Sequence, residues 1–163
     1  MIFAIAVLLL IGVLSAEALA EAKPGTSAAD FKMTTTSGEQ VTLSELKGRV
    51  VVINFWASWC PGCIYEFPGL NRLADKLSDI PVTFVALSED INPQDMTGFL
   101  QKQKPLFMNV AWDVNGIIAG SYGVNALPTT IVVDKRGIIR MFQLGYRPGD
   151  EKKIEDLVNE LLK

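Results

Sequence analysis

The sequence predicts an α/β protein with a mixed central sheet that is flanked by helices and covered on both faces. Two nearly uninterrupted apolar runs, residues 49–56 and 82–87, are typical of buried strands. Helical segments follow both runs, and the first has apolar residues at three- and four-residue spacing. Residues 130–144 then predict two strands joined by a turn, followed by a last amphipathic helix. Strands that alternate with helices and end in a hairpin fit one mixed sheet.

The first elements expected along the chain are two short strands and a turn of helix. Residues 31–35 and 40–43 flank Ser37-Gly38, a dipeptide typical of hairpin turns. Residues 44–48 predict a brief helical turn that ends at glycine. The helix after the first buried strand presents these residues on one face: Cys63, Phe67, Leu70, Ala74 and Leu77. We expect Pro68 to kink this helix rather than end it, because the apolar spacing continues beyond it.

The second half of the chain continues the alternation. After the strand at residues 82–87 we expect a helix from about residue 93 to 103 and a short strand at residues 106–111. Residues 114–122 predict a further helix, although two glycines within them lower helix propensity.

The end of the chain predicts a hairpin and a helix. Residues 130–133 and 138–144 are the hairpin strands, and residues 134–137 form the turn. A last helix is expected from about Asp150. Its buried face would consist of Ile154, Leu157, Val158 and Leu161.

Residues 1–20 are expected to be a signal peptide or an N-terminal anchor. The first 14 residues are apolar, and Ala18-Leu19-Ala20 is a candidate cleavage site. This run is shorter than the roughly 20 apolar residues of a membrane span and suits a signal-peptide core. A basic n-region is missing, since Lys23 is the first lysine. Export with cleavage and membrane anchorage by residues 1–16 therefore both remain open.

A single domain is expected after this segment. Residues 21–29 are rich in small residues and predict a linker, and residues 30–163 are enough for one sizeable core. The 15 Lys and Arg residues and 18 Asp and Glu residues give a formal net charge of −3. Because there is no basic stripe, nucleic acid is not an expected partner.

The chemistry is predicted to centre on Cys60 and Cys63, the only cysteines of the chain. They lie where the first buried strand gives way to a helix. Unpaired backbone N–H groups and the helix dipole favour a thiolate at Cys60 and should lower its pKa. Pro61 suits the first helical turn, because its missing N–H has no partner there. Cys60 is therefore the candidate nucleophile and Cys63 the resolving thiol.

A static disulfide and a metal site are the alternatives for this pair. A bridge that closes so small a loop would stabilise the fold little by the chain-entropy argument. A zinc site normally needs about four Cys or His ligands, whereas the chain has no histidine and no third cysteine. We expect no cofactor beyond the redox-active Cys60–Cys63 disulfide itself.

Two segments resemble a known family. The run FWASWCPGC at residues 55–63, followed by EFP at residues 66–68, resembles the active-site segment of the thioredoxin superfamily. More narrowly, it is similar to exported thiol-disulfide oxidoreductases of the TlpA/ResA/CcmG type. The run YGVNALPTT at residues 122–130 is similar to the family's segment before its penultimate strand pair. The resemblance extends from about residue 29 to the C-terminus and departs at Asp30, which relatives precede with a proline.

The resemblance implies a thioredoxin fold with an N-terminal β-hairpin and an inserted helix-strand unit at residues 93–111. It also implies a cis Leu127–Pro128 peptide opposite the cysteines, which would turn the Leu127 backbone toward a docking peptide. The alternative is an ordinary trans proline, with Leu127 as a core residue. Trp59 and Pro61 are further candidates for substrate binding. Trp59 and Trp56 could shape the rim around the exposed sulfur, although aromatic residues at such positions are equally expected in the core.

Glu66 is the candidate proton carrier. It follows Cys63 by three positions and so lies on nearly the same helix face, where relatives carry an acid. If it is buried, its pKa should rise; the alternative is a solvated glutamate near a helix N-terminus. Asn54 stands where thioredoxin carries an aspartate. Because asparagine does not titrate, Glu66 is left as the substitute proton carrier. The alternative is that Asn54 only hydrogen-bonds the backbone of a neighbouring strand. Glu89 and Asp90 are expected to form a solvated acidic loop.

The resemblance implies an enzyme, a protein-disulfide reductase of the periplasm or the outer face of the cytoplasmic membrane. Its partners would be exported disulfide proteins such as apocytochrome c, with electrons from a membrane donor of the CcdA/DsbD kind. An oxidant or isomerase stays open, because Pro61-Gly62 does not fix a reduction potential. A Cu(I) chaperone also stays open, with Met108 or Met141 as a soft third ligand. A peroxiredoxin is disfavoured, because the Thr-x-x-Cys environment is absent around Cys60.

Overall fold

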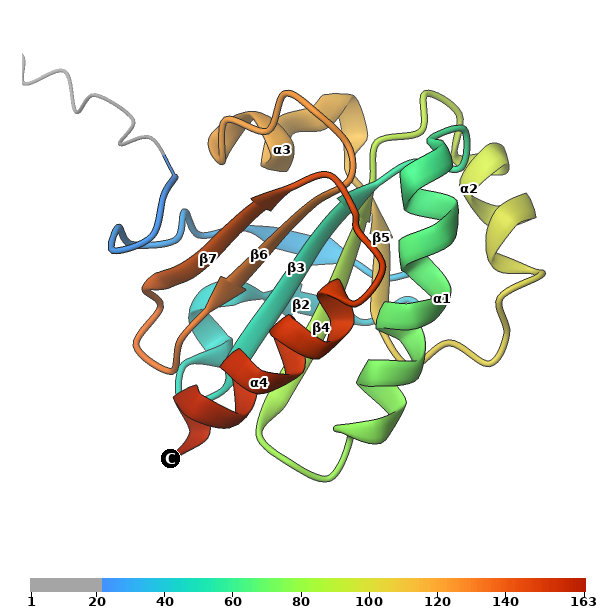
Figure 1. The fold of residues 1–163 in the computed structure, drawn as a ribbon. Coiled ribbons are helices and arrows are strands. Elements are labelled where there is room, and N and C mark those ends of the chain that lie inside the picture. Colours follow the sequence, from blue (N-terminus) through green and yellow to red (C-terminus); the bar gives the residue numbers. More distant parts are fainter. Residues whose placement is uncertain (1–21) are drawn as a thin grey trace, which may run out of the picture.

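A mixed sheet runs through the middle of the computed structural model, which describes residues 22–163 (Figure 1). Its strands are β3 (Val50–Trp56), β4 (Val82–Ser88), β5 (Asn109–Trp112), β6 (Thr129–Val133) and β7 (Ile139–Leu144). They are ordered β5-β4-β3-β6-β7. The strands β3, β4 and β5 are parallel, whereas β6 is antiparallel to β3 and β7 to β6. The predicted mixed sheet is confirmed.

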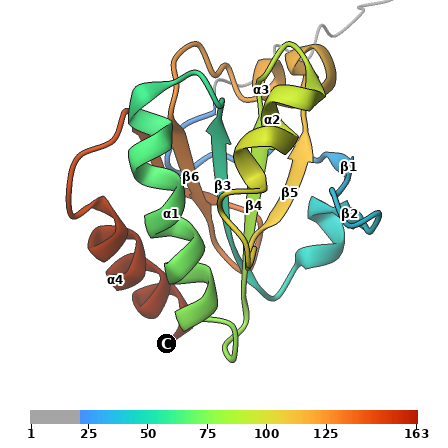
Figure 2. The same cartoon turned by 90° about the vertical axis from the view of Figure 1, so that its right-hand side faces the viewer.

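Helices cover one face of this sheet, and a hairpin with a short helix covers the other. The remaining elements are α1 (Pro61–Lys76), α2 (Pro93–Leu100), α3 (Ile117–Ser121), α4 (Asp150–Leu162), the strands β1 (Lys32–Thr34) and β2 (Gln40–Thr42), and the 3-10 turns η1 (Leu43–Leu46) and η2 (Val114–Gly116). Figure 2 shows α1 and α4 on one side of the sheet and the β1–β2 hairpin on the other. The expected N-terminal hairpin and inserted α2–β5 unit are both present.

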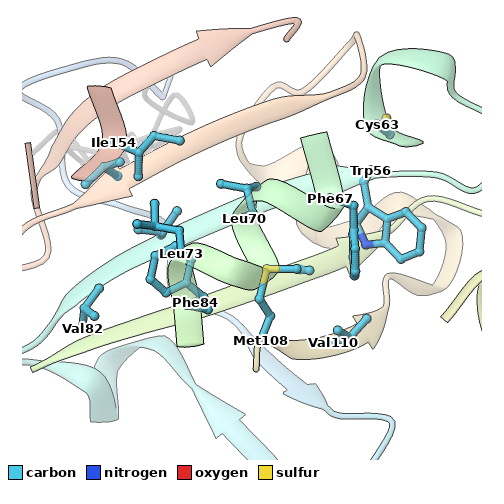
Figure 3. Close-up of a cluster of buried hydrophobic side chains, with 14 of the residues drawn as sticks. Trp56, Cys63, Phe67, Leu70, Leu73, Val82, Phe84, Met108, Val110 and Ile154 are labelled. Atoms are coloured by element: carbon cyan, nitrogen blue, oxygen red, sulfur yellow. The ribbon is translucent and has the colours of Figure 1, made fainter. Parts of the chain in front are cut away.

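The strand β3 is the centre of the core. All seven of its residues are buried, because neighbours pair with both its edges and both its faces are covered. Trp56, Phe67, Leu70 and Ile154 belong to the hydrophobic cluster between the sheet and the helices α1, α2 and α4. Figure 3 shows Trp56 and Phe67 beside Cys63 at one end of this cluster and Ile154 at the other. The core therefore extends directly under the cysteine pair.

A second hydrophobic cluster fills the opposite face, under the hairpin and α3. It includes Phe31, Phe55 and Tyr122, and the Tyr122 ring lies 6.4 Å from that of Phe31 and 5.8 Å from that of Phe55. The Tyr122 hydroxyl donates a 2.6 Å hydrogen bond to the backbone oxygen of Ala29. This contact joins the segment after α3 to the start of the hairpin.

Three elements differ from their predicted form. The helix α2 ends at Leu100 rather than near residue 103, and β5 spans residues 109–112 rather than 106–111. The helix expected at residues 114–122 is broken into η2 and α3, because Asn115 and Gly116 take left-handed φ values of 60° and 63°. In contrast, α1 continues through Pro68 to Lys76, as expected.

The segment expected to be a linker is partly bound to the sheet. Backbone N–H groups of Gly25 and Ala28 donate to the oxygens of Ile139 and Gly137, at 2.8 and 2.9 Å. The Ile139 N–H donates back to the Thr26 oxygen at 2.9 Å. The reason is that β7 is an edge strand with unpaired backbone groups. At the other edge, the Thr36 N–H donates to Val110 of β5 at 2.8 Å.

The expectation for residues 1–20 lies outside the described residues. Between residues 22 and 163, none of the helices has the length and apolar character of a membrane span.

Leu70→Ala tests the importance of the core under α1. Leu70 is fully buried in the first cluster, so truncation should lower the free energy of unfolding by about 3 kcal/mol. Ile117→Ala is the matched control, because Ile117 is 69% exposed and should change it by less than about 0.5 kcal/mol. Urea denaturation followed by circular dichroism measures both, and equal effects would contradict this account of the core.

Candidate active site

The two cysteines lie at the junction of β3 and α1 and form a disulfide. Cys60 is the N-cap residue of α1 and Cys63 lies in its first turn, with Cα atoms 5.2 Å apart. The Cys63 N–H points at Cys60 Sγ at 3.2 Å. Cys63 has no exposed surface and Cys60 retains 4%, so Cys60 is the more accessible of the two, although less open than expected for a nucleophile.

The start of α1 favours negative charge at Cys60. Pro61 is the first helical residue, as the sequence predicts, and the N–H groups of the following residues have no partners within the helix. One of them, that of Cys63, is directed at Cys60 Sγ. When the disulfide is reduced, a thiolate on Cys60 would therefore be stabilised by this donor and by the helix dipole.

Pro128 lies directly against the cysteine turn. The Leu127–Pro128 peptide is cis, as expected. A Cβ atom added to Gly62 would lie 3.1 Å from Pro128 Cδ, so the two residues are already close. The Pro128 oxygen accepts a hydrogen bond from the Gly145 N–H at 2.8 Å, which joins it to the end of β7. The close approach of Gly62 was not predicted, because it depends on the distant pairing of β3 with β6.

The Leu127 backbone lacks a hydrogen-bond partner in the described part of the chain. Within residues 22–163 its N–H and C=O form no hydrogen bond, although it adjoins the start of β6. Its side chain is half-buried against both hydrophobic clusters. Leu127 therefore combines the role of a packed residue with an open backbone edge, the arrangement by which an extended peptide adds to a sheet.

The two tryptophans near the cysteines have different surroundings. Trp59, which precedes Cys60 directly, is 64% exposed and so lies at the rim of the site. Trp56 is fully buried, and its ring centroid lies 4.6 Å from that of Phe67 and 5.0 Å from that of Phe99. Trp59 thus has the rim position expected of it, whereas Trp56 belongs to the core.

Glu66 is buried in the sheet-facing side of α1. It is 1% exposed, and its Oε2 accepts a hydrogen bond from Asn54 Nδ2 at 2.8 Å. Its Oε1 accepts one from the Thr130 hydroxyl at 3.1 Å. Loss of hydration on burial raises the pKa of the Glu66 carboxyl to about 7, against the opposing effect of these two hydrogen bonds. The carboxyl is thus a proton acceptor near neutral pH, and the solvated alternative is wrong.

Asn54 and Thr130 position this carboxyl. Asn54 Nδ2 also donates to the Thr130 hydroxyl at 2.9 Å, so the three side chains form one buried network on β3, β6 and α1. The alternative in which Asn54 bonds only a neighbouring strand's backbone is therefore wrong. Thr130 was missed in the sequence, where its only signal was a polar residue inside an apolar strand.

The acidic pair after β4 is not a solvated loop. Asp90 is 2% exposed, and Asp113, at the end of β5, is 3% exposed. Glu89 is half-buried. Its pKa is raised to about 8, mainly by loss of hydration and to a smaller extent by its electrostatic interaction with the nearby Asp113. The expectation failed because Ser58 and Ser88 surround Asp90 with hydrogen-bond donors, contacts that sequence periodicity cannot report.

The methionines proposed as metal ligands lie away from the sulfurs. Met108 is part of the core, and Figure 3 shows it well separated from Cys63. Met141 pairs with Val132, four residues along β6 from Pro128 and hence about 13 Å from it. Among residues 22–163 there is no group of three His, Cys, Asp or Glu side chains that could hold a metal ion. The third-ligand expectation is therefore wrong for both residues.

Together these features define a class of protein. A mixed sheet flanked by helices, a Cys-x-x-Cys disulfide at the strand-to-helix junction and a cis-proline against it are the features of thioredoxin-fold disulfide proteins. The particular family follows from comparison with known proteins: the chain belongs to the AhpC/TSA family, whose model matches residues 24–142.

Individual relatives narrow the resemblance. The thioredoxin-like protein YneN of Bacillus subtilis is 35% identical over 125 residues, 74% of this chain and 71% of YneN. The thiol-disulfide oxidoreductase ResA of Bacillus thuringiensis is 37% identical over 113 residues, 69% of this chain but 65% of ResA, just under two thirds of its length. A Chlorobium tepidum crystal structure, described as a candidate thiol:disulfide interchange protein DsbE, has a TM-score of 0.80 and 33% identity. It covers 88% of this chain and 100% of its own, which confirms the fold.

The raised pKa of Glu66 predicts a pH-dependent stability. The carboxyl ionises near 4.5 in the unfolded chain and near 7 in the folded one, so between these values only the unfolded chain releases the proton. The unfolding free energy of the oxidised wild type should therefore fall, relative to Glu66→Gln, by about 3 kcal/mol as the pH rises from 4.5 to 8.

Urea denaturation of both oxidised proteins at the two pH values measures this difference. All other titrating groups, including Glu89, are common to the two chains and cancel in the comparison. A difference between wild type and variant that does not change with pH would show that the carboxyl ionises normally.

Proposed function

We propose that the protein is an exported thiol-disulfide oxidoreductase that reduces disulfides in partner proteins through a Cys60/Cys63 dithiol cycle. The observation that carries the proposal is the placement of the disulfide at the N-terminus of α1, with a buried carboxyl of pKa about 7, Glu66, on the same helix. A purely structural bridge would require neither feature. Relatives named as thiol-disulfide oxidoreductases support the same activity.

The first step is attack by reduced Cys60. Its thiolate, stabilised by the Cys63 N–H and the helix dipole, attacks one sulfur of the partner's disulfide. That S–S bond breaks as the Cys60–partner bond forms, and the other partner sulfur leaves as a thiolate that takes a proton from solvent. The exposed Trp59 and the open Leu127 backbone would hold the partner chain in an extended form across the cysteine turn.

The second step is resolution by Cys63. Its thiol transfers a proton to the Glu66 carboxylate, and the resulting thiolate attacks Cys60 Sγ. The mixed disulfide breaks, the second partner sulfur leaves, and the Cys60–Cys63 disulfide forms. The partner has gained two electrons and the protein has lost two. A carboxyl with a pKa of about 7 suits this transfer, because both of its protonation states are populated near neutral pH.

We place this cycle outside the cytoplasm, in the periplasm or on the outer face of the cytoplasmic membrane. The apolar N-terminal run supports export. Apocytochrome c is the partner we propose first, because the family resemblance points to cytochrome c maturation. Electrons would return to Cys60 and Cys63 from a membrane donor of the CcdA/DsbD kind.

Cys63→Ser should trap the partner. Without the resolving thiol, the mixed disulfide on Cys60 persists after the first step. Expressed in its own host, the variant should accumulate disulfide-linked adducts that mass spectrometry identifies as exported disulfide proteins. The double variant Cys60→Ser, Cys63→Ser is the control and should trap nothing. The oxidoreductase assignment fails if the single variant also stays free of adducts while it binds Cu(I) through Cys60.

The reduction potential decides the direction of the cycle. We expect a value near the roughly −270 mV of thioredoxin, measured by equilibration with glutathione or dithiothreitol buffers. A value near the roughly −120 mV of a strong oxidant such as DsbA would replace the reductase with the oxidant or isomerase.

A further inference from the structure

Asp90 is a buried carboxylate that reaches from the end of β4 to the turn before Cys60. Both of its oxygens accept the Ser58 N–H, at 3.1 Å each. Oδ1 also accepts the Ser58 hydroxyl at 2.7 Å, and Oδ2 accepts the Ser88 hydroxyl at 2.7 Å. Within residues 22–163 no Lys or Arg forms an ion pair with it. Its charge is therefore balanced only by neutral donors, and Ser58 supplies two of the three.

Asp90 itself is held in place by its neighbours. Its own N–H donates to the Ser88 hydroxyl at 3.2 Å, and its backbone oxygen accepts the Trp112 indole N–H at 2.7 Å. Ser88 ends β4 and Trp112 ends β5, so two strands fix the backbone of Asp90. The carboxylate is thus a rigid support, whereas the turn that it contacts lies outside every helix and strand.

That turn carries the nucleophile. The Cys60 N–H donates to the Ala57 oxygen at 3.2 Å, so residues 57–60 form one turn with Ser58 in its middle. Its two ends, Ala57 and Cys60, are buried in the hydrophobic cluster, whereas Trp59 in the middle projects into solvent. The hydrogen bonds of Ser58 to Asp90 therefore anchor the middle of the turn, next to the residue that aligns with the Cys63 N–H.

We propose that Asp90 is a positioning residue of the dithiol site: by binding Ser58 it fixes the turn at residues 57–60 and so aligns Cys60 with the N-terminus of α1. This inference deepens the proposed oxidoreductase function and rests on it. Loss of the contact would let Cys60 move relative to the helix N–H groups, which weakens thiolate stabilisation and the approach to a disulfide.

Two substitutions of Asp90 separate this role from its charge. Asp90→Asn removes the charge but keeps most of the contacts. With its oxygen at the Oδ1 position, it can still accept the Ser58 N–H and hydroxyl, and its amide can donate to the Ser88 hydroxyl; only the bond from the Ser58 N–H to the second oxygen is lost. Asp90→Ala removes the charge and the contacts together. Both variants are neutral, so any difference between them reports the contacts alone. Ser58→Ala removes one of the three contacts to Ser58 and supplies a milder third variant.

The experiment uses the full chain with Cys63→Ser, which leaves Cys60 as the only thiol. Iodoacetamide alkylation from pH 4 to 9 gives the Cys60 pKa, and reaction with the small disulfide 5,5′-dithiobis(2-nitrobenzoate) gives the exchange rate of the thiolate. We expect Asp90→Ala to have a Cys60 pKa about half a pH unit above that of Asp90→Asn. Its thiolate should exchange about tenfold more slowly. Ser58→Ala, which keeps the Asp90 charge, is compared with the Cys63→Ser parent and should shift both quantities in the same direction by a smaller amount.

Asp134 provides the matched control. It is also a buried carboxylate that accepts backbone N–H groups, those of Arg136 and Ile138, but it lies at the β6–β7 turn. Asp134→Ala and Asp134→Asn should differ in urea unfolding and not in thiol pKa or exchange rate. The same pattern for the Asp90 pair, equal thiol behaviour with unequal stability, would reduce Asp90 to a structural residue and overturn the proposal.

If Asp90→Ala does not fold, Ser58→Ala compared with the Cys63→Ser parent, which has the same charges, decides the question by the same two measurements. A wild-type pKa and rate for Ser58→Ala would then overturn the proposal. Both probes are small reagents, so the outcome does not depend on which protein partner the Cys63→Ser variant traps. A failure of the proposed function and a failure of this inference are therefore distinguishable.

Discussion

The whole site depends on the pairing of β3 with strands on both of its edges. The antiparallel partner β6 begins where β3 ends, with Phe55 opposite Thr129, and this brings Pro128 against the cysteine turn. The parallel partner β4 ends at the same edge, with Trp56 opposite Ser88, and this brings Asp90 to the other side. Because parallel strands share a carboxyl edge and an antiparallel strand starts there, one register assembles the components of the site.

In the proposed cycle, proton transfer would rely on an acid, because the chain has no histidine. Burial moves the pKa of Glu66 to about 7 and that of Glu89 to about 8. Asn54 and Thr130 limit the rise at Glu66 by donating hydrogen bonds to its charged form. A carboxyl that ionises near neutrality costs folding stability above its ordinary pKa, and the packed core around Leu70 and Phe67 offsets that cost.

The local sequence pattern predicted most of the fold, whereas only the assembled structure revealed the hydrogen-bond partners of the site residues. The β-branched run of β3 and the apolar spacing of α1 locate the cysteines correctly, since both are properties of neighbouring residues. Thr130 was missed and Asp90 was wrongly expected to be solvated, because their contacts join segments far apart in sequence, and periodicity carries no register. The prediction of one helix at residues 114–122 was wrong for a local reason. The adjacent left-handed residues Asn115 and Gly116 interrupt a helix that apolar content alone would extend.

The N-terminal segment contacts both borders of the sheet, through Gly25 and Ala28 at β7 and Thr36 at β5. Unpaired edge strands are templates on which copies of a protein associate, and many proteins prevent such association by covering the edge. Here residues 25–36 cover part of both edge strands of the sheet. In the proposed reaction, the unpaired backbone left for an extended substrate would be that of Leu127, next to the sulfurs, because the N-terminal segment already occupies part of the two sheet edges.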